Sequence, residues 1–387
     1  MSQLLHIALL IETSREYGRG ILRGIARYHL EYGPWSIYFE PHELRGRPPF
    51  WLKDWRGDGI LARIDNRQLA DVILSTGLPA VDVRGVLPDS PIPFVGSDDR
   101  AIAQVGFEHL RDCGLKNFAY IGLLRGENQN LDRRCDAFVE LVRTANKQCD
   151  VFHENRTRRK SISWELEQQQ VGEWLKNLPK PVGVMACQDD RGHQVLDACR
   201  RAGLRVPDEV AVIGSGNDAN VCSLCSPPLT SIDLNPSRVG YEAASLLMRL
   251  MKGDPPPEGP VLVGPPRGIV RRQSTDLLAI EDEDVAEALR FIRDHATEGI
   301  GASDVIANAR QAPSTLSQRI KSFLGRSLAS EITRVRLERA KLLLKETDLP
   351  VGTIAIRSGF SELKYFCDVF QKNERTTPSA YRKPFRS

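Results

Sequence analysis

Short, largely apolar runs alternate with amphipathic stretches over the first two thirds of the chain. The runs occupy residues 6–11, 35–40, 58–64, 79–84, 93–98, 118–123, 182–187 and 210–215. In the stretches between them, apolar residues recur every three or four positions, which indicates helices. Strands that are apolar at every position are expected where helices cover both faces of a parallel sheet. The pattern predicts an α/β fold, and about 275 residues of it predict two Rossmann-like, doubly wound lobes.

The pattern changes between residues 273 and 284, and only helical periodicity follows. Helices are expected at 285–296, 303–309, 328–348 and 351–359, and in the segments after residues 314 and 361. A short helix, a tight turn and a second helix occur twice, which predicts two helix-turn-helix motifs. We therefore expect residues 1–277 to form a two-lobed domain and residues 278–387 to form an all-α domain.

Charge is distributed unevenly between these two parts. The whole chain has a net charge of +3. Residues 285–387 hold 18 lysines and arginines against 11 aspartates and glutamates, a net charge of +7, which leaves −4 on the first 284 residues. A basic C-terminal domain on a slightly acidic body favours nucleic-acid binding. A solvated basic surface without a partner is the alternative.

Several classes of protein find no support in the sequence. The start, MSQLLHIALLIE, lacks the basic region and cleavage site of a secretory signal, and no run approaches the ~18 apolar residues of a membrane span. Eight scattered cysteines, with one isolated CxxC at Cys222 and Cys225, indicate a reducing cytoplasm and no zinc site. No P-loop, nucleophile elbow or HExxH motif is present, so we expect no cofactor, no metal and no enzymatic activity.

Three glycines near the N-terminus, Gly18, Gly20 and Gly24, resemble the glycine fingerprint of dinucleotide-binding enzymes. In that fingerprint the first glycine follows the strand almost at once, so that the pyrophosphate meets the helix N-terminus. Here the first strand ends near Ile11, seven residues before Gly18. We therefore expect Gly20 and Gly24 to let the first helix pack closely, and a Rossmann-type oxidoreductase remains only an alternative.

The C-terminal sequence RLERAKLLLKETDLPVGTIAIRSGFSELKYFCDVFQKNERTTPSAYRK resembles the AraC/XylS-type DNA-binding domain. The resemblance rests on I-A, G-F, Y-F, F, T-P and Y-R at fixed spacing. It implies two helix-turn-helix units that enter successive major grooves of duplex DNA, about 34 Å apart. By position against the family, base contacts are expected from Ser314, Ser317, Gln318, Leu363, Lys364, Cys367 and Asp368, and phosphate contacts from Arg319, Lys321, Lys372, Arg375 and Arg382.

Residues 182–218 and the segment SPPLTSIDLNPSRVGYEAASLLMRLMKG resemble the effector core of LacI/GalR-type repressors. This resemblance implies the periplasmic-binding-protein fold, with two lobes, a ligand cleft between them and chain crossovers near 110–116, 230–236 and 262–266. A LacI-type core followed by an AraC-type domain is similar to the layout of xylose-responsive operon regulators. The effector implied is a small sugar, a pentose such as xylose.

The resemblance also implies which residues contact the sugar. Asp189 matches the family's sugar-binding aspartate and Arg134 its cleft arginine, while Asp98 lies at another strand end. The family's second aspartate is replaced by Gly216, and the neighbouring Asn217 and Asp218 are candidates to substitute for it. The loop after the first strand also faces the crevice, so Ser14, Tyr17 and Arg19 are candidate contacts, with capping and packing of the helix start as the alternative.

These observations predict a cytoplasmic transcription regulator that binds duplex DNA and is controlled by a sugar. The resemblance further implies a homodimer, and RNA polymerase is an additional candidate partner; no membrane partner is expected. The alternatives are a regulator that responds to another small polar effector, and a periplasmic solute-binding protein. The solute-binding protein would need a signal peptide and would lack the basic C-terminal domain.

Overall fold

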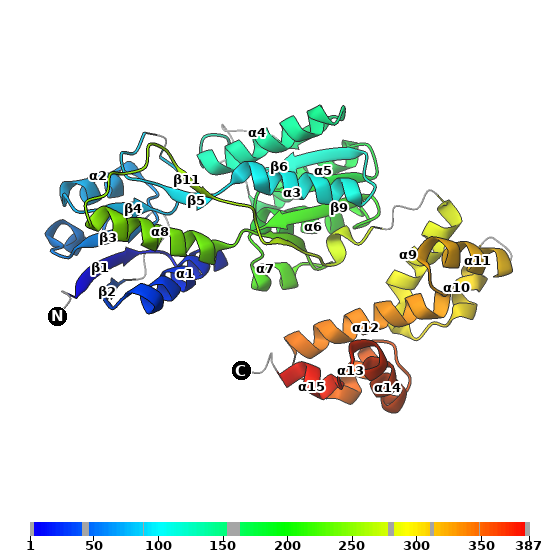
Figure 1. Ribbon diagram of the computed structural model, residues 1–387. Coiled ribbons are helices and arrows are strands. Elements are labelled where there is room, and N and C mark those ends of the chain that lie inside the picture. The colour runs from blue at the N-terminus through cyan, green and yellow to red at the C-terminus, as the bar shows by residue number, and fades with distance from the viewer. Residues whose placement is uncertain are drawn as a thin grey trace. The chain divides into compact units, whose positions relative to one another are not determined.

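The computed structural model describes residues 4–40, 46–87, 89–152, 163–277, 282–309, 313–347 and 349–383. The chain divides into two compact units, Met1–Leu277 and Leu278–Ser387. The first unit contains parallel β-sheets covered by helices, and the second consists of helices (Figure 1). In the part of the chain that the structure describes, no helix is both long and apolar enough to cross a membrane.

The N-terminal lobe of the first unit contains a parallel sheet in the order β2-β1-β3-β4, which a bridge from Asp82 to Phe94 extends to the pair β5-β11. Alternate residues of β1 pack on opposite faces: Ile7 and Leu9 meet α1 and α8, while Ala8 and Leu10 meet α2 and η1. The elements are β1 (Leu5–Leu10), α1 (Glu16–Tyr32), β2 (Trp35–Phe39), η1 (Phe50–Asp54), β3 (Gly59–Ala62), α2 (Arg67–Ser75), β4 (Ala80–Asp82), β5 (Val95–Ser97), α8 (Pro236–Met251) and β11 (Val261–Val263).

Close packing of α1 against α8 explains the N-terminal glycines. A Cβ at Gly24 would lie 1.9 Å from the carbonyl oxygen of Ser237, and a Cβ at Gly20 would lie 2.3 Å from Cγ of Pro236. The two helix backbones therefore approach more closely than any larger residue allows. The prediction that these glycines serve helix packing is confirmed.

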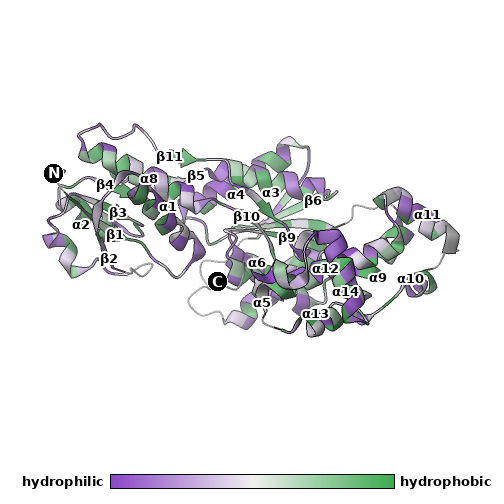
Figure 2. Ribbon diagram, turned by 60° about the horizontal axis from the view of Figure 1, so that its bottom comes forward, coloured by the Kyte–Doolittle hydropathy of each residue, from purple (hydrophilic) through white to green (hydrophobic). Residues whose placement is uncertain are grey.

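The C-terminal lobe contains a six-stranded sheet in the order β12-β10-β9-β8-β6-β7, in which only β12 runs antiparallel to its neighbour. Helices α3 and α4 cover one face, and α5, α6 and α7 cover the other. Helices such as α3 and α6 carry both hydrophobic and hydrophilic residues (Figure 2). The elements are α3 (Asp99–Asp112), β6 (Asn117–Ile121), α4 (Gln129–Thr144), β7 (Cys149–Phe152), α5 (Trp164–Asn177), β8 (Val182–Ala186), α6 (Asp189–Ala202), β9 (Val210–Ser215), α7 (Ala219–Leu224), β10 (Thr230–Asp233), β12 (Gly268–Val270) and η2 (Gln273–Thr275).

The chain passes between the lobes three times. It leaves β5 and enters α3 at residues 97–99, returns between β10 and α8 at residues 234–236, and crosses again between β11 and β12 at residues 264–267. The first crossover therefore does not lie at 110–116, where the family resemblance located it. Ile102, Phe107 and Leu110 of α3 belong to the core of the C-terminal lobe, so the chain has already crossed before this helix begins.

The second unit contains two small hydrophobic cores that share one long helix, α12. Helices α9, α10 and α11 pack against its first half, and α13, α14 and α15 belong with its second half. Each half holds a pair of consecutive helices, α10 and α11 in the first and α13 and α14 in the second. The elements are α9 (Glu283–His295), η3 (Ala296–Glu298), α10 (Ala302–Asn308), α11 (Pro313–Leu324), α12 (Leu328–Glu346), α13 (Val351–Arg357), α14 (Leu363–Glu374) and α15 (Pro378–Arg382).

Candidate functional site: an interlobe cleft and two surface helices

A cleft of about 480 Å³ lies between the two lobes of the first unit. Residues that follow β1, β3 and β4 line it from one lobe, and residues that follow β6, β8 and β9 line it from the other. Ligands of open parallel sheets bind at these carboxyl ends of the strands. Polar and charged side chains from both lobes line the cleft, among them Arg15, Glu16, Tyr17, Arg63, Ser97, Asp99, Arg134, Gln188, Asp189, Asp190, Ser215 and Asp218.

Asp189 is the first residue of α6 and is only 4% exposed. Its carboxylate accepts hydrogen bonds from the hydroxyl of Ser231 and from the backbone N–H of Asp218, the latter at 2.8 Å. Burial raises the pKa of Asp189 to about 6, and these two neutral donors offset only part of that effect. A buried carboxylate at a cleft wall is a strong acceptor for the hydroxyl hydrogens of a neutral ligand.

Two glycines at the end of β9 make room for this carboxylate. A Cβ at Gly214 would lie 2.4 Å from Oδ1 of Asp189, and one at Gly216 would lie 3.0 Å from Oδ2. Gly216 also has a φ of +130°, a conformation that residues with a side chain rarely adopt. An aspartate at position 216, as in the LacI-type pattern, would therefore displace Asp189.

Arg134 of α4 is 5% exposed and connects three elements behind the cleft wall. Its Nε and Nη2 donate to Oδ1 of Asp99 at 3.1 and 2.8 Å, and Nη1 donates to the carbonyl oxygen of Cys187 at 2.7 Å and to Oγ of Ser215 at 2.8 Å. A guanidinium has five N–H donors, and four of these are engaged here. Arg134 lines the cleft, but it mainly holds α3, β8 and β9 in position.

Four of the predicted ligand contacts lie outside the cleft wall: Asp98 and Asn217, and also Ser14 and Arg19 of the loop after β1. Asp98 is the N-cap of α3, where its carboxylate accepts from the backbone N–H groups of Arg100 and Ala101, and the next residue, Asp99, lines the cleft instead. Asn217 accepts a hydrogen bond from Arg272 through its side-chain oxygen at 2.9 Å. The side chains of Asp98 and Asn217 are used to hold the backbone that surrounds the site.

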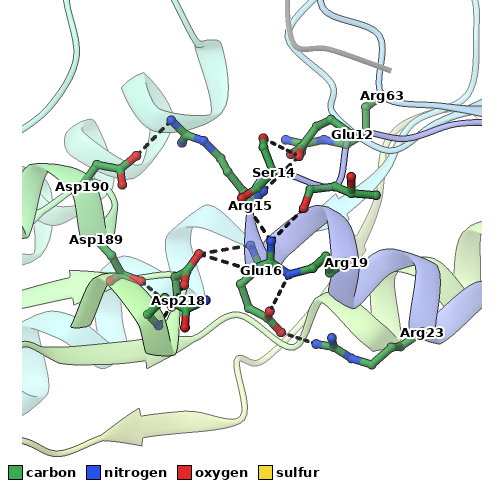
Figure 3. A network of polar contacts seen from close by, with 12 residues as sticks. Glu12, Ser14, Arg15, Glu16, Arg19, Arg23, Arg63, Asp189, Asp190 and Asp218 are labelled. Carbon is green, nitrogen blue, oxygen red and sulfur yellow. Dashed lines mark hydrogen bonds and ion pairs between the residues drawn. The ribbon is translucent and has the colours of Figure 1, made fainter. Parts of the chain in front are cut away.

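The loop after β1 has only part of its predicted role (Figure 3). Tyr17 lines the cleft, and its hydroxyl lies 3.2 Å from Oγ of Ser97. Ser14 donates to Glu12, and Arg19 donates to the carbonyl oxygens of Thr13 and Ser14. Ser14 and Arg19 do not line the cleft. Ser14 follows the capping and packing alternative, whereas Arg19 also forms an ion pair with Asp218 of the other lobe at 3.7 Å.

Polar contacts from this loop reach across the cleft to the other lobe (Figure 3). Arg15 forms an ion pair with Asp190 at 2.9 Å and a hydrogen bond with Gln188 at 3.1 Å. The backbone N–H of Glu16 donates to Oδ2 of Asp218 at 3.2 Å. The backbone N–H of Asp218 also donates to the carboxylate of Asp189, the predicted sugar contact. Asp218 therefore connects Asp189 to the hydrogen bond between the lobes.

Arg63 is a wall residue that the sequence pattern missed. It follows β3, is 7% exposed, forms an ion pair with Glu12, and lies 5.5 Å from the ring centroid of Tyr17. The available signal was a charged residue near the end of the apolar run 58–64, at the same sheet edge as Tyr17. A single arginine at the end of a strand is not distinctive enough in a sequence to be recognised.

In the second unit, α11 and α14 expose one face and bury the other. Leu316, Ile320, Phe366 and Phe370 are buried, as the helical periodicity predicts. Of the proposed base contacts, Gln318, Leu363, Lys364 and Asp368 are exposed, Ser317 and Cys367 are partly buried, and the side chain of Ser314 lies outside the described residues. Lys321 and Lys372 are exposed, as phosphate contacts must be.

Two arginines assigned to phosphate contacts have partners within the second unit. Arg382 is 6% exposed and donates to the carbonyl oxygen of Leu349 at 2.6 Å, so it fixes α15 and is not available to DNA. Arg319 forms ion pairs with Asp282 and Asp284, at the start of α9. The helical position of each arginine was clear from the sequence, but the carbonyl and the carboxylates beside them come from distant segments.

Comparisons with known proteins agree with this architecture. Family models match a XylR N-terminal domain at residues 6–97, a periplasmic binding protein-like domain at 107–275 and a helix-turn-helix domain at 307–384. The structure of the xylose-binding transcription activator XylR is similar with a TM-score of 0.79 and 29% identity, over 99% of both chains. The xylose operon regulatory protein of Haemophilus influenzae is 29% identical over 98% of both chains. That of Escherichia coli K12 is 31% identical over 97% of this chain and 96% of its own, which shows that this chain belongs to the family of xylose operon regulatory proteins.

Proposed function

We propose that this chain is a cytoplasmic transcription regulator that binds a small sugar in the interlobe cleft and duplex DNA through its second unit. Xylose or a related pentose is the effector that we favour, because the relatives that match the whole chain are named for xylose. The observation that carries the proposal is the buried carboxylate of Asp189 in the wall of a 480 Å³ cleft. That volume lies within the range of sites for small ligands.

In this proposal Asp189 accepts hydrogen bonds from sugar hydroxyls, while Tyr17 offers a ring face and a hydroxyl. Arg134 and Asp99 hold the wall, and Asp218 connects the ligand site to α1 of the other lobe. The sugar changes the interlobe geometry only to the extent that it binds one geometry more tightly than the other. We propose that a homodimer transmits this change to promoter DNA and to RNA polymerase, without catalysis by the chain itself.

For DNA, we propose that the exposed faces of α11 and α14 enter successive major grooves. Gln318, Lys364 and Asp368 would contact base edges, and Lys321 and Lys372 would contact phosphates. These side chains are exposed, and the unit that contains them holds the basic excess of the chain.

The effector proposal is tested by thermal unfolding of the full-length protein with xylose, xylulose, arabinose, ribose, xylitol and glucose. A sugar at about 100 times its Kd adds about 2.7 kcal/mol, which corresponds to a Tm increase of about 5 °C or more in a unit of this size. Asp189→Ala should remove the increase. Asp98→Ala, which removes a helix cap outside the cleft, should lower the Tm without sugar but keep the increase. An unchanged Tm increase in Asp189→Ala would contradict the proposed site. If only glucose or xylitol raised the Tm, the proposal that the effector is a pentose would be wrong.

The DNA proposal is tested by titrating duplex DNA with the full-length protein between 50 and 200 mM salt. The logarithm of affinity should fall linearly with the logarithm of salt concentration. Lys372→Ala should reduce that slope by about one and leave sequence preference unchanged, whereas Lys364→Ala should change the preference. Binding that does not depend on salt, or no binding to any duplex, would contradict the proposal.

A further inference from the structure

The two helix-turn-helix halves of the second unit are joined by α12, and each half has its own core. Ile332 and Val335 of α12 belong to the first core, while Leu337 and Ala340 belong to the second. The boundary between the cores therefore falls within a single turn of α12. A continuous helix is the covalent connection at this point, and long helices are rarely straight.

Arg336 lies at this boundary and contacts the first half. Its Nε donates to the carbonyl oxygen of Ala296 at 2.8 Å, and its Nη2 donates to that of Ile300 at 2.6 Å. Ala296 is the C-cap of α9, where carbonyl oxygens lack partners within the helix, and Ile300 lies between η3 and α10. The planar guanidinium reaches both carbonyls at once, which a lysine ammonium on a flexible chain does not reproduce.

The second half meets the same arginine from the other side. The guanidinium carbon of Arg336 lies 5.8 Å from the ring centroid of Phe360, and Gly359 forms the turn between α13 and α14. Gly359 has a φ of +84°. A Cβ at this position would lie 2.4 Å from the carbonyl oxygen of Ala296 and 2.9 Å from Nε of Arg336. The turn of the second motif therefore rests directly on the first half.

We propose that Arg336 is a positioning residue, and that its contacts with Ala296, Ile300 and Phe360 hold α11 and α14 at one fixed distance and orientation. The inference rests on the proposed DNA-binding function, in which both helices must reach successive major grooves together. Two linked modules bind much more tightly than either alone only when their geometry permits simultaneous contact. We call the contacts of Arg336 with Ala296, Ile300 and Phe360 the clamp; in our proposal the clamp fixes the distance between α11 and α14. A glycine is required at position 359 because no side chain fits there between the two halves.

The clamp itself is tested without DNA, in the full-length protein. Spin labels on non-canonical residues at the exposed positions Gln318 and Lys372 report the distance between α11 and α14. Arg336→Lys keeps the charge, and Gly359→Ala disrupts the junction from the other side; both should at least double the width of the distance distribution. Gly325→Ala is the matched control, because Gly325 also has a positive φ of +68° but no atom within 4 Å of its missing Cβ. Unchanged widths in both junction variants would overturn the proposal.

The consequence for DNA is tested on a duplex that the wild-type protein selects from a random-sequence pool. Inserting two base pairs between its two half-sites rotates them by about 70° and should reduce wild-type affinity about 100-fold. In Arg336→Lys the reduction should be about 10-fold or less, since loosely joined halves tolerate the rotation. If the variant loses the same factor on every duplex and melts earlier, Arg336 only stabilises the unit and the proposal is wrong. If the wild-type protein selects no duplex, the proposed DNA-binding function fails, while the spin-label distances still decide whether the clamp exists.

Discussion

Replacing Asp189 by asparagine should stabilise the protein in the absence of sugar while abolishing its response to sugar. The substitution keeps the shape of the side chain and removes its charge. An aspartate in an unfolded chain has a pKa of about 3.9, whereas burial raises the pKa of Asp189 to about 6. The difference corresponds to about 3 kcal/mol of folding free energy, by which the buried charge destabilises the folded protein at neutral pH.

The net effect is smaller, because the amide does not reproduce both hydrogen bonds. Its oxygen can still accept from the backbone N–H of Asp218, but the bond with Ser231 is weakened at a cost of about 1 kcal/mol. We therefore expect Asp189→Asn to gain about 2 kcal/mol at pH 7.5. For a unit of this size that is a Tm increase of about 4 °C.

The pH dependence gives the sign of the effect. Between pH 4 and pH 6 the folded wild-type protein binds more protons at Asp189 than the unfolded chain does, so its stability falls as the pH rises through this window. The variant has no such group. The Tm difference should therefore be largest above pH 6 and should disappear, or change sign slightly, near pH 4.

Calorimetry of the first unit's transition, with the full-length protein between pH 4 and pH 7.5, measures this difference. Asp190→Asn is the matched control: it makes the same change one residue away, on a side chain that is half exposed, and should alter stability by less than about 1 kcal/mol. If Asp189→Asn melts at or below the wild-type temperature at pH 7.5, or if the difference is the same at both ends of the pH range, burial of the charge is not what raises the pKa and the reasoning fails.

Three further outcomes are expected. Arg134→Ala leaves the buried carboxylate of Asp99 without its ion pair and should destabilise the first unit by about 3–5 kcal/mol in urea unfolding; a loss below 1 kcal/mol would contradict the role assigned to this pair. Gly24→Ala should destabilise the same unit by about 2 kcal/mol or more because its Cβ meets α8, whereas Gly259→Ala, whose Cβ would have no atom within 4 Å, should have little effect. Equal losses of stability in the two variants would argue against the packing explanation. Arg15→Ala removes exposed contacts with Asp190 and Gln188 and should change the free energy of unfolding by less than about 1 kcal/mol, yet it should increase the radius of gyration measured by X-ray scattering without sugar. An unchanged radius of gyration would mean that these contacts do not hold the lobes together.

Local patterns in the sequence determined the type and order of most elements. Apolar runs predicted the buried strands β1, β3, β8 and β9, and helical periodicity predicted the second unit. Strand β7 was missed because it lies at the edge of its sheet and is only partly buried, so its sequence CDVF lacks a continuous apolar run. The spacing of I-A, G-F and T-P was sufficient to indicate the DNA-binding fold, since a turn and the core of a helix pair require particular residues at those positions.

Only the tertiary structure decided which polar residue performs which task. Asp98 and Asp99 are adjacent and chemically identical, but one caps α3 and the other faces Arg134, because Asp98 is the extended N-cap before the helix and Asp99 is its first residue. Arg382 and Arg336 have carbonyl partners more than 30 positions away in the chain. The packing of distant segments decides which polar group lies within hydrogen-bonding distance of a charged side chain. The local sequence around that side chain therefore does not predict its partner.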